Sequence, residues 1–177
     1  MIFHDTPLPD VFVIEPQPIE DERGFFARTF AHDEFRKRGL RTSFAQCSVS
    51  YNRKAGTLRG MHFQRAPHEE AKLIRCTSGA IFDVALDLRR ESPSYRRWFS
   101  VELTAENRRM IYVPEGVAHG LQTLADHSEV FYQISVPFEA AAAAGVRWDD
   151  PAFGITWPPA DRRVISARDR SYPDFGG

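Results

Sequence analysis

The chain consists mainly of short runs of β-forming residues, each bounded by Gly, Pro, Asn or Asp. Strands of this size and spacing, with almost no helical periodicity between them, are typical of an antiparallel sandwich or barrel. The sequence therefore predicts an all-β fold with strands at residues 11–15, 24–30, 44–51, 57–64, 72–77, 80–88, 97–103, 110–113, 120–124 and 129–136.

The clearest strand pattern lies in residues 80–88, where apolar side chains occupy the even positions and Asp83 and Asp87 fall on the opposite face. A helix is predicted only over residues 33–38, with Asp33 as its N-cap and Gly39 as its stop. The alanine run 140–144 is expected to form a helical turn or a surface loop. Four prolines beyond residue 150 indicate that the C-terminal third consists mostly of loops and short helices.

Length and composition limit the classes of protein that need to be considered. A chain of 177 residues can bury a core without disulfides or metal, so we treat residues 1–177 as one domain. The 23 basic and 24 acidic residues give a formal net charge of -1, which provides no general attraction to nucleic acid or to an anionic membrane. Cys47 and Cys76 form no CxxC pair, and the sequence has neither a membrane-spanning run nor a secretory signal. We expect a cytoplasmic protein with no nucleic-acid or membrane partner.

The segment 56–64 (GTLRGMHFQ) is the densest group of chemically versatile residues. A histidine in an apolar strand is costly to bury without hydrogen-bond partners, so His62 is either a satisfied core residue or a functional one. Simple alternation puts His62 and Arg59 on opposite faces of the strand. If both serve one site, the strand must change register between them, and Gly60 is the natural place for a bulge.

A second histidine, His119, follows a Pro and Gly turn in the sequence VPEGVAHG. With the first segment it resembles a degenerate two-part cupin motif, whose metal-binding form carries His-x-His. Here residues 62–64 read HFQ, and an amide is a weak ligand for a transition metal. The remaining ligands would be His62, His119 and either Glu69 or Glu70, so a metal-dependent oxygenase or isomerase stays open as an alternative.

Two further side chains allow both an ordinary and a functional interpretation. Tyr132 shares an apolar strand face with Val130 and Ile134, so its ordinary role is that of a core tyrosine whose hydroxyl finds one partner. Asp169 lies between two arginines and would ordinarily be a solvated surface charge. The remaining histidines are expected at the surface, namely His4, His32, His68 and His127.

Several segments resemble, in order, the signature segments of the dTDP-4-dehydrorhamnose 3,5-epimerase family. They are residues 21–26 (DERGFF), 58–64 (LRGMHFQ), 72–74 (KLI), 114–120 (PEGVAHG), 148–151 (WDDP) and 166–169 (SARD). The resemblance spans about residues 23–169 at family-like spacing. It implies a cupin-type jelly-roll β-sandwich with a few short helices and a homodimer whose subunits exchange N-terminal segments. It also implies a nucleotide-sugar substrate and neither a metal ion nor another cofactor.

The activity that the resemblance implies is inversion of C3 and C5 in a nucleotide-linked 4-keto-6-deoxyhexose, converting dTDP-4-dehydro-6-deoxy-D-glucose to dTDP-4-dehydro-L-rhamnose. The C4 ketone makes the hydrogens at C3 and C5 removable, because the resulting carbanion is delocalised as an enolate. By resemblance, His62 is the base, Asp169 orients it and Tyr132 is the acid, while Lys72 stabilises the enolate. The resemblance implies substrate-binding roles for Arg23, Phe26, Gln46, Ser48, Arg59, His119, Phe138 and Arg168.

The sequence departs from the family pattern at three places. Ser48 stands where Asn is common, Ala27 and Arg28 where Glu is common, and Phe138 where Tyr is common. These departures bear on the nucleotide base and the sugar rather than on proton transfer. Besides the metal-dependent cupin, the alternatives are a 3-epimerase acting on a related nucleotide sugar and a non-catalytic cupin that binds a sugar nucleotide.

Overall fold

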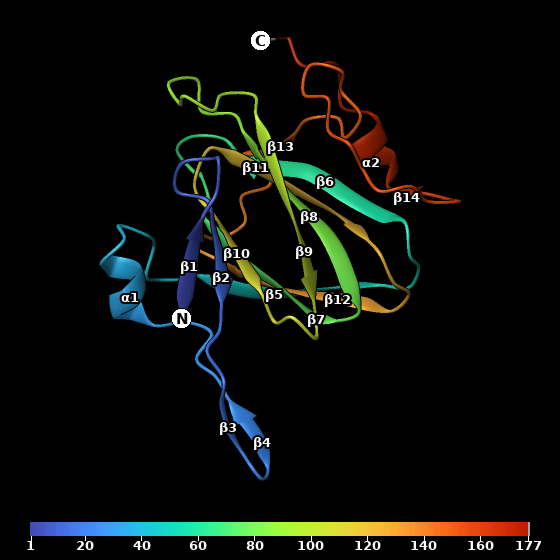
Figure 1. Cartoon of the computed structure of the whole chain (residues 1–177). Helices are drawn as coiled ribbons and strands as arrows, with labels where there is room; N and C mark the ends of the chain where they lie inside the picture. Colours follow the sequence, from blue (N-terminus) through green and yellow to red (C-terminus); the bar gives the residue numbers. More distant parts are fainter. Residues whose placement is uncertain (177) are drawn as a thin grey trace.

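Two antiparallel sheets face each other in the structure, a computed structural model that describes residues 1–176 (Figure 1). The first sheet contains, in spatial order, β1 (Ile2–Asp5), β2 (Phe12–Glu15), β10 (Met110–Val113), β7 (Lys72–Ser78), β12 (Ser128–Ile134) and β5 (Gln46–Asn52). The second contains β13 (Ala143–Gly145), β6 (Thr57–Gln64), β11 (Val117–Thr123), β8 (Ala80–Asp87) and β9 (Trp98–Thr104), with β14 (Val164–Ile165) parallel to β6. From β5 onward the chain crosses between the sheets at nearly every connection, as in a jelly roll. The predicted all-β sandwich is confirmed.

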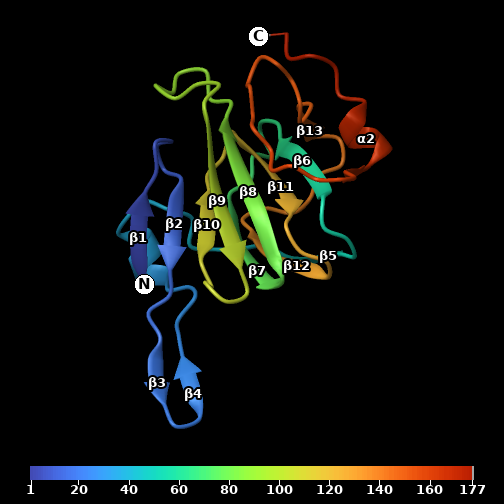
Figure 2. The ribbon, with the colours of Figure 1, turned by 45° about the vertical axis from the view of Figure 1, so that its right-hand side comes forward.

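A separate hairpin of β3 (Ile19–Asp21) and β4 (Gly24–Phe26) projects away from the two sheets (Figures 1 and 2). The predicted strand at 24–30 therefore ends earlier than expected. Strands β1 and β3 were not predicted, because each is short and has no clean alternation of its own. The strand that carries His119 begins at Val117, directly after the Pro and Gly turn, rather than at residue 120.

The interior between the sheets is filled by apolar residues from both, including Ile74 and Val130 from the first and Ile81 and Leu121 from the second. The outer face of the second sheet is also covered, because the C-terminal segment packs Trp157 and other aromatic side chains on it. Both faces of β8 are consequently buried. The two faces predicted from its alternation are present, but Asp83 and Asp87 lie on the interior side with no exposed surface.

The predicted helix is present as α1 (His32–Arg36), which buries Phe35 against the ring of Tyr112 in the first sheet. The prediction that Asp33 caps it is wrong. The N-cap is Ala31, whose side chain makes no capping hydrogen bond, and Asp33 instead lies in the first turn. Gly39 has a φ of +71°, which explains why the helical segment ends there.

The C-terminal third is mostly irregular, as predicted, with one short helix, α2 (Ala167–Arg170). The expectation for the alanine run holds only for its first part. Residues 140–142 form a turn, whereas Ala143 and Ala144 belong to β13 and pair with Gln64 and Phe63 of β6. Neither α1 nor α2, the helices of the described residues, has the length or the apolar character needed to cross a membrane.

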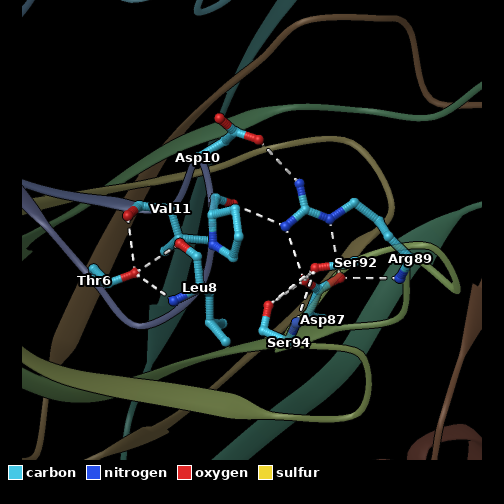
Figure 3. Close-up of polar contacts among 9 residues, drawn as sticks. Thr6, Leu8, Asp10, Val11, Asp87, Arg89, Ser92 and Ser94 are labelled. Carbon is cyan, nitrogen blue, oxygen red and sulfur yellow. Dashed lines mark hydrogen bonds and ion pairs between the residues drawn. The ribbon is translucent and has the colours of Figure 1, made fainter.

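The loop between β8 and β9 is fastened by Asp87, whose carboxylate accepts hydrogen bonds from Arg89, Ser92 and Ser94 (Figure 3). Arg89 reaches further, to Asp10 and to the carbonyl of Pro9 in the turn between β1 and β2. Burial alone would raise the pKa of Asp87, but these hydrogen bonds lower it to about 2. One buried carboxylate thus joins the two turns at this end of the sandwich.

Candidate active site

A cavity of about 280 Å³ is lined by residues of both sheets and collects most of the site residues predicted from the sequence. Antiparallel pairing of β5 with β12 places Ser48 opposite Tyr132, so that their side chains share one face. A larger cavity of about 750 Å³, near Gly56 and the 159–162 loop, contains none of the predicted residues. The predicted residues that line the smaller cavity are Gln46, Ser48, Arg59, His62, Lys72, His119, Tyr132 and Phe138.

A bulge in β6 allows Arg59 and His62 to line the same cavity. His62 pairs with His119, and Arg59 pairs with Leu121. The two pairs are three residues apart along β6 but only two apart along β11, so β6 contains one extra residue at this point. Gly60 lies at this point with a φ of +131°, and a Cβ atom there would lie 2.5 Å from the Cα of Gly120. The predicted change of register at Gly60 is confirmed, and only glycine fits the close approach of the two strands.

His62 is hydrogen-bonded to Asp169, which α2 brings from the far end of the chain. Its Nε2 atom lies 2.7 Å from Asp169 Oδ1, and its side chain, which lines the cavity, is 40% exposed. Asp169 is buried and also faces the backbone N–H of Gly60 at 3.4 Å. Burial alone would raise the pKa of Asp169, but the hydrogen bond and charge of His62, helped by Gly60, hold it below its ordinary value. Asp169 is therefore not the solvated surface charge of the ordinary interpretation.

Tyr132 belongs to β12 and meets the ring of His119 edge to face, with centroids 6.0 Å apart. Burial raises the pKa of Tyr132, and the negative charge of Asp83 adds to this, whereas Arg59 acts in the opposite direction. The phenol thus stays protonated at neutral pH. Within residues 1–176 its hydroxyl makes no hydrogen bond, unlike the satisfied core tyrosine of the ordinary interpretation, so it is free to meet a ligand in the cavity.

Lys72 and Glu70 form an ion pair in the cavity wall, with Nζ 2.9 Å from Glu70 Oε1. Lys72 Nζ also donates to the backbone carbonyl of His62 at 3.3 Å. Both side chains are almost entirely buried, so the ammonium is held in place before any ligand enters.

His119 forms a second pair of imidazole and carboxylate, with Nε2 2.8 Å from Asp83 Oδ2. Asp83 is fully buried, and its other oxygen has no hydrogen-bond partner among the described residues. Arg59 Nε donates to Oδ1 of the buried Asn52 at 2.7 Å. Sequence reasoning gave Asp83 and Asn52 no role at the site. The signal for Asp83 was an acid within a strand whose neighbours are nearly all apolar.

Four of the predicted residues do not line this cavity, and Asp169 is connected to it only through His62. Arg23 and Phe26 lie on the projecting hairpin, where Arg23 is paired with Asp21 and its side chain is 84% exposed. Arg168 is exposed on α2, where it donates to the hydroxyl of Tyr172 at 3.1 Å. Among the residues of the cavity rim, Gln46 accepts the backbone N–H of Phe138 at 3.1 Å.

The ligand set suggested for a metal does not assemble. His62 and His119 are bound to different carboxylates, and Glu70 is bound to Lys72. Across the described part of the chain, no three His, Cys, Asp or Glu side chains are grouped closely enough to hold a metal ion. The other four histidines are exposed, as predicted.

Comparisons with known proteins agree on one family. A sequence model of dTDP-4-dehydrorhamnose 3,5-epimerases matches residues 5–176. The enzyme of that name from Sinorhizobium fredii is 41% identical over 175 residues, which is 99% of this chain and 90% of that protein. A crystal structure of the Bacillus anthracis enzyme with TDP and PPi bound superposes with a TM-score of 0.93 at 38% identity, covering 98% of this chain and 99% of that one. A 3'-monoepimerase from Streptomyces bikiniensis, in complex with dTDP-quinovose, superposes with a TM-score of 0.89 at 31% identity, covering 97% and 86%.

Proposed function

Because the chain belongs to the dTDP-4-dehydrorhamnose 3,5-epimerase family, an isomerase family, we propose that it inverts both C3 and C5 of dTDP-4-dehydro-6-deoxy-D-glucose. The product is dTDP-4-dehydro-L-rhamnose, formed by proton transfer through an enolate. The observation that carries this proposal is the arrangement of the cavity: the His62 and Asp169 pair, the protonated phenol of Tyr132 and the ammonium of Lys72 all serve one small space.

In this mechanism His62 is the base. Its Nε2 atom is occupied by Asp169, so Nδ1 is the ring nitrogen that takes the proton from the sugar carbon. The electron pair of the broken C–H bond moves into the ring and onto the C4 oxygen, giving an enolate. The negative charge of Asp169 favours the imidazolium that forms at the same moment.

Tyr132 is the acid that completes each inversion. It gives its hydroxyl proton to the same carbon from the opposite face, the enolate returns to a ketone, and a phenolate remains. Before the second carbon reacts, His62 releases its extra proton to solvent and the Tyr132 phenolate takes up a proton from solvent. A positioned acid or base contributes about 10² to 10⁴ in rate, so the two residues act together.

The other predicted site residues, including Arg168 outside the cavity, bind and polarise the sugar nucleotide. Lys72 supplies positive charge for the developing enolate oxygen, a contribution of roughly 3 to 4 kcal/mol at sites of this kind. Arg59 and Arg168 are suited to the diphosphate, because arginine gives paired charged hydrogen bonds. The nucleotide-sugar substrate is supported by the similar structures that hold TDP or a dTDP-sugar.

We further propose a homodimer in which the hairpins are exchanged. Arg23 and Phe26 lie on a hairpin that projects from its own chain, and Ile19 and Phe26 are 73% and 70% exposed. A two-stranded hairpin with exposed apolar residues gains little stability in water, whereas a second copy would cover it. In such a dimer, Arg23 and Phe26 of one copy would reach the cavity of the other. The cytoplasmic location expected from the sequence stays a prediction.

The test is to incubate the protein with dTDP-4-dehydro-6-deoxy-D-glucose in deuterated water and follow the ring protons by NMR. Exchange and inversion at both C3 and C5 are expected. A Tyr132→Phe variant should still admit deuterium while its yield of epimer falls by about 10² or more, because only the acid step is removed. Absence of exchange in the unmodified protein would contradict the proposed function.

The second candidate is a 3-epimerase, favoured by the similarity to the Streptomyces bikiniensis 3'-monoepimerase. The same experiment separates the two activities, because a 3-epimerase would exchange and invert only at C3.

A further inference from the structure

Glu70 is a charged residue of the cavity wall to which the mechanism gives no task. Its carboxylate lies 2.9 Å from Lys72 Nζ, and the two side chains are only 9% and 8% exposed. The segment between them is fixed from both sides. The N–H of Ala71 donates to Ser135 Oγ at 2.8 Å, and the carbonyl of Ala71 accepts the N–H of Ser135 at 3.0 Å. The backbone between Glu70 and Lys72, at the point where β7 begins, is therefore fixed to Ser135.

The hydrogen bonds of Lys72 leave one direction open. An ammonium group has three N–H donors and no acceptor. One faces Glu70 and one faces the carbonyl of His62, both in the cavity wall. The third is available to a ligand in the cavity that Lys72 lines.

Two other carboxylates and one amide near the cavity each pair with a group other than Lys72. Asp169 is bound to His62, Asp83 to His119 and Asn52 to Arg59. Among the described residues, Glu70 is thus the carboxylate that lies against Lys72. A buried ammonium without a carboxylate beside it tends to lose its proton or to turn toward water.

We propose that Glu70 is a positioning residue for the epimerisation, acting through Lys72. Its carboxylate holds the ammonium group in place, so that the third N–H points toward the C4 oxygen, where the enolate charge develops. This inference rests on the proposed function, because it takes Lys72 as the group that stabilises the enolate. It differs from the earlier metal alternative, in which Glu70 would be a ligand.

The first test compares Glu70→Gln with Glu69→Gln, its neighbour in the chain, which is not among the cavity residues. Gln keeps a hydrogen-bond acceptor but removes the negative charge. We expect E70Q to lower kcat about 10-fold to 100-fold while KM changes less than about twofold, since the loss falls on the transition state. The E69Q control should keep both constants. An E70Q enzyme with unchanged kcat would overturn the inference.

A double-mutant cycle with Lys72→Met tests whether Glu70 acts through the lysine. If it does, E70Q adds less than about a twofold further loss of solvent-deuterium exchange at C3 in the K72M background. Losses that multiply in the double variant would mean that Glu70 acts independently, and would overturn the inference.

The Glu70→Asp variant distinguishes a loss of charge from a purely structural effect of the substitution. It retains the charge, so it should keep a higher kcat than E70Q at equal thermal stability, and equal losses in both would also overturn the inference. If the unmodified protein exchanges no proton, the proposed function is contradicted. If the unmodified protein exchanges normally and E70Q has the same kcat, only the role of Glu70 is contradicted.

Discussion

At the scale of single residues, we expect the negative charge of Asp169 to matter more for the proposed reaction than the hydrogen bond it makes to His62. Asp169→Asn keeps a side chain of the same size 2.7 Å from His62 but cannot favour an imidazolium. We expect kcat to fall about 10-fold to 100-fold, the difference between a neutral and a charge-assisted hydrogen bond. Steady-state rates and thermal unfolding would measure this. Asp174→Asn, which alters a surface ion pair with Arg147 in the same segment, should change kcat less than about twofold. Equal effects of the two variants would contradict the role of Asp169.

The contact between His62 and Asp169 joins positions 107 residues apart, so no local pattern could predict it. Periodicity alone made Tyr132 a core residue and Asp169 a surface charge, and only the resemblance to a family brought them together with His62. Asp83 was the reverse case. It was visible in the sequence as an acid in an apolar strand, but a strand buried on both faces gives no indication of which face meets the cavity.

At the scale of elements, the bulge of β6 is the feature that assembles the cavity. Gly60→Ala would place a methyl group 2.5 Å from Gly120 Cα at a φ of +131°. We expect a loss of at least about 2 kcal/mol in the free energy of unfolding, and a large loss of kcat as His62 and Arg59 are displaced. Gly154→Ala is the matched control, because Gly154 also has a positive φ but no atom within 4 Å of the added Cβ. It should cost only about 1 kcal/mol and leave kcat unchanged. Denaturant unfolding and initial rates would measure both variants.

The loop fastened by Asp87 should make stability depend on pH. The pKa of Asp87 in the folded chain is about 2, below its ordinary 3.8, so its contribution is fully present above about pH 4 and is lost as the pH falls toward 2. The size of this shift corresponds to about 2 kcal/mol. Asp87→Asn should therefore be less stable at pH 7 by about that amount, with the difference shrinking below pH 4. Urea unfolding at several pH values would measure it, and a difference that stays constant with pH would contradict this origin.

The elements that sequence patterns predicted well were those whose local signal matches their final environment. Strand β6 has the predicted bounds, and the bulge followed from the need to bring two residues to one face. Strands β1, β3 and β13 were missed because each is short and is defined by its pairing partner rather than by its own residues. For β13 that partner is β6, and alanines at a sheet edge have no strand preference of their own.

At the scale of the whole molecule, the proposed dimer explains why Arg23 and Phe26 lie away from the cavity. Both are on the hairpin, which contributes nothing to the cavity of its own chain among the described residues. If the hairpin instead completes the cavity of a second copy, each active site needs a cavity from one chain and a hairpin from the other. Sequence patterns could not predict this, because a dimer interface leaves no periodicity that differs from a chain's own core.

Exchange of the hairpin can be tested by mixing two inactive variants. Arg23→Ala should lose activity through its hairpin and His62→Ala through its cavity. In a mixed dimer, one site combines the intact cavity of the R23A chain with the intact hairpin of the H62A chain. Co-expression should therefore restore about a quarter of normal activity, since half of the dimers are mixed and one of their two sites is complete. Purified single variants provide the baseline. If each hairpin served its own chain, or if the protein were a monomer, every site in the mixture would carry one defect and no activity would return.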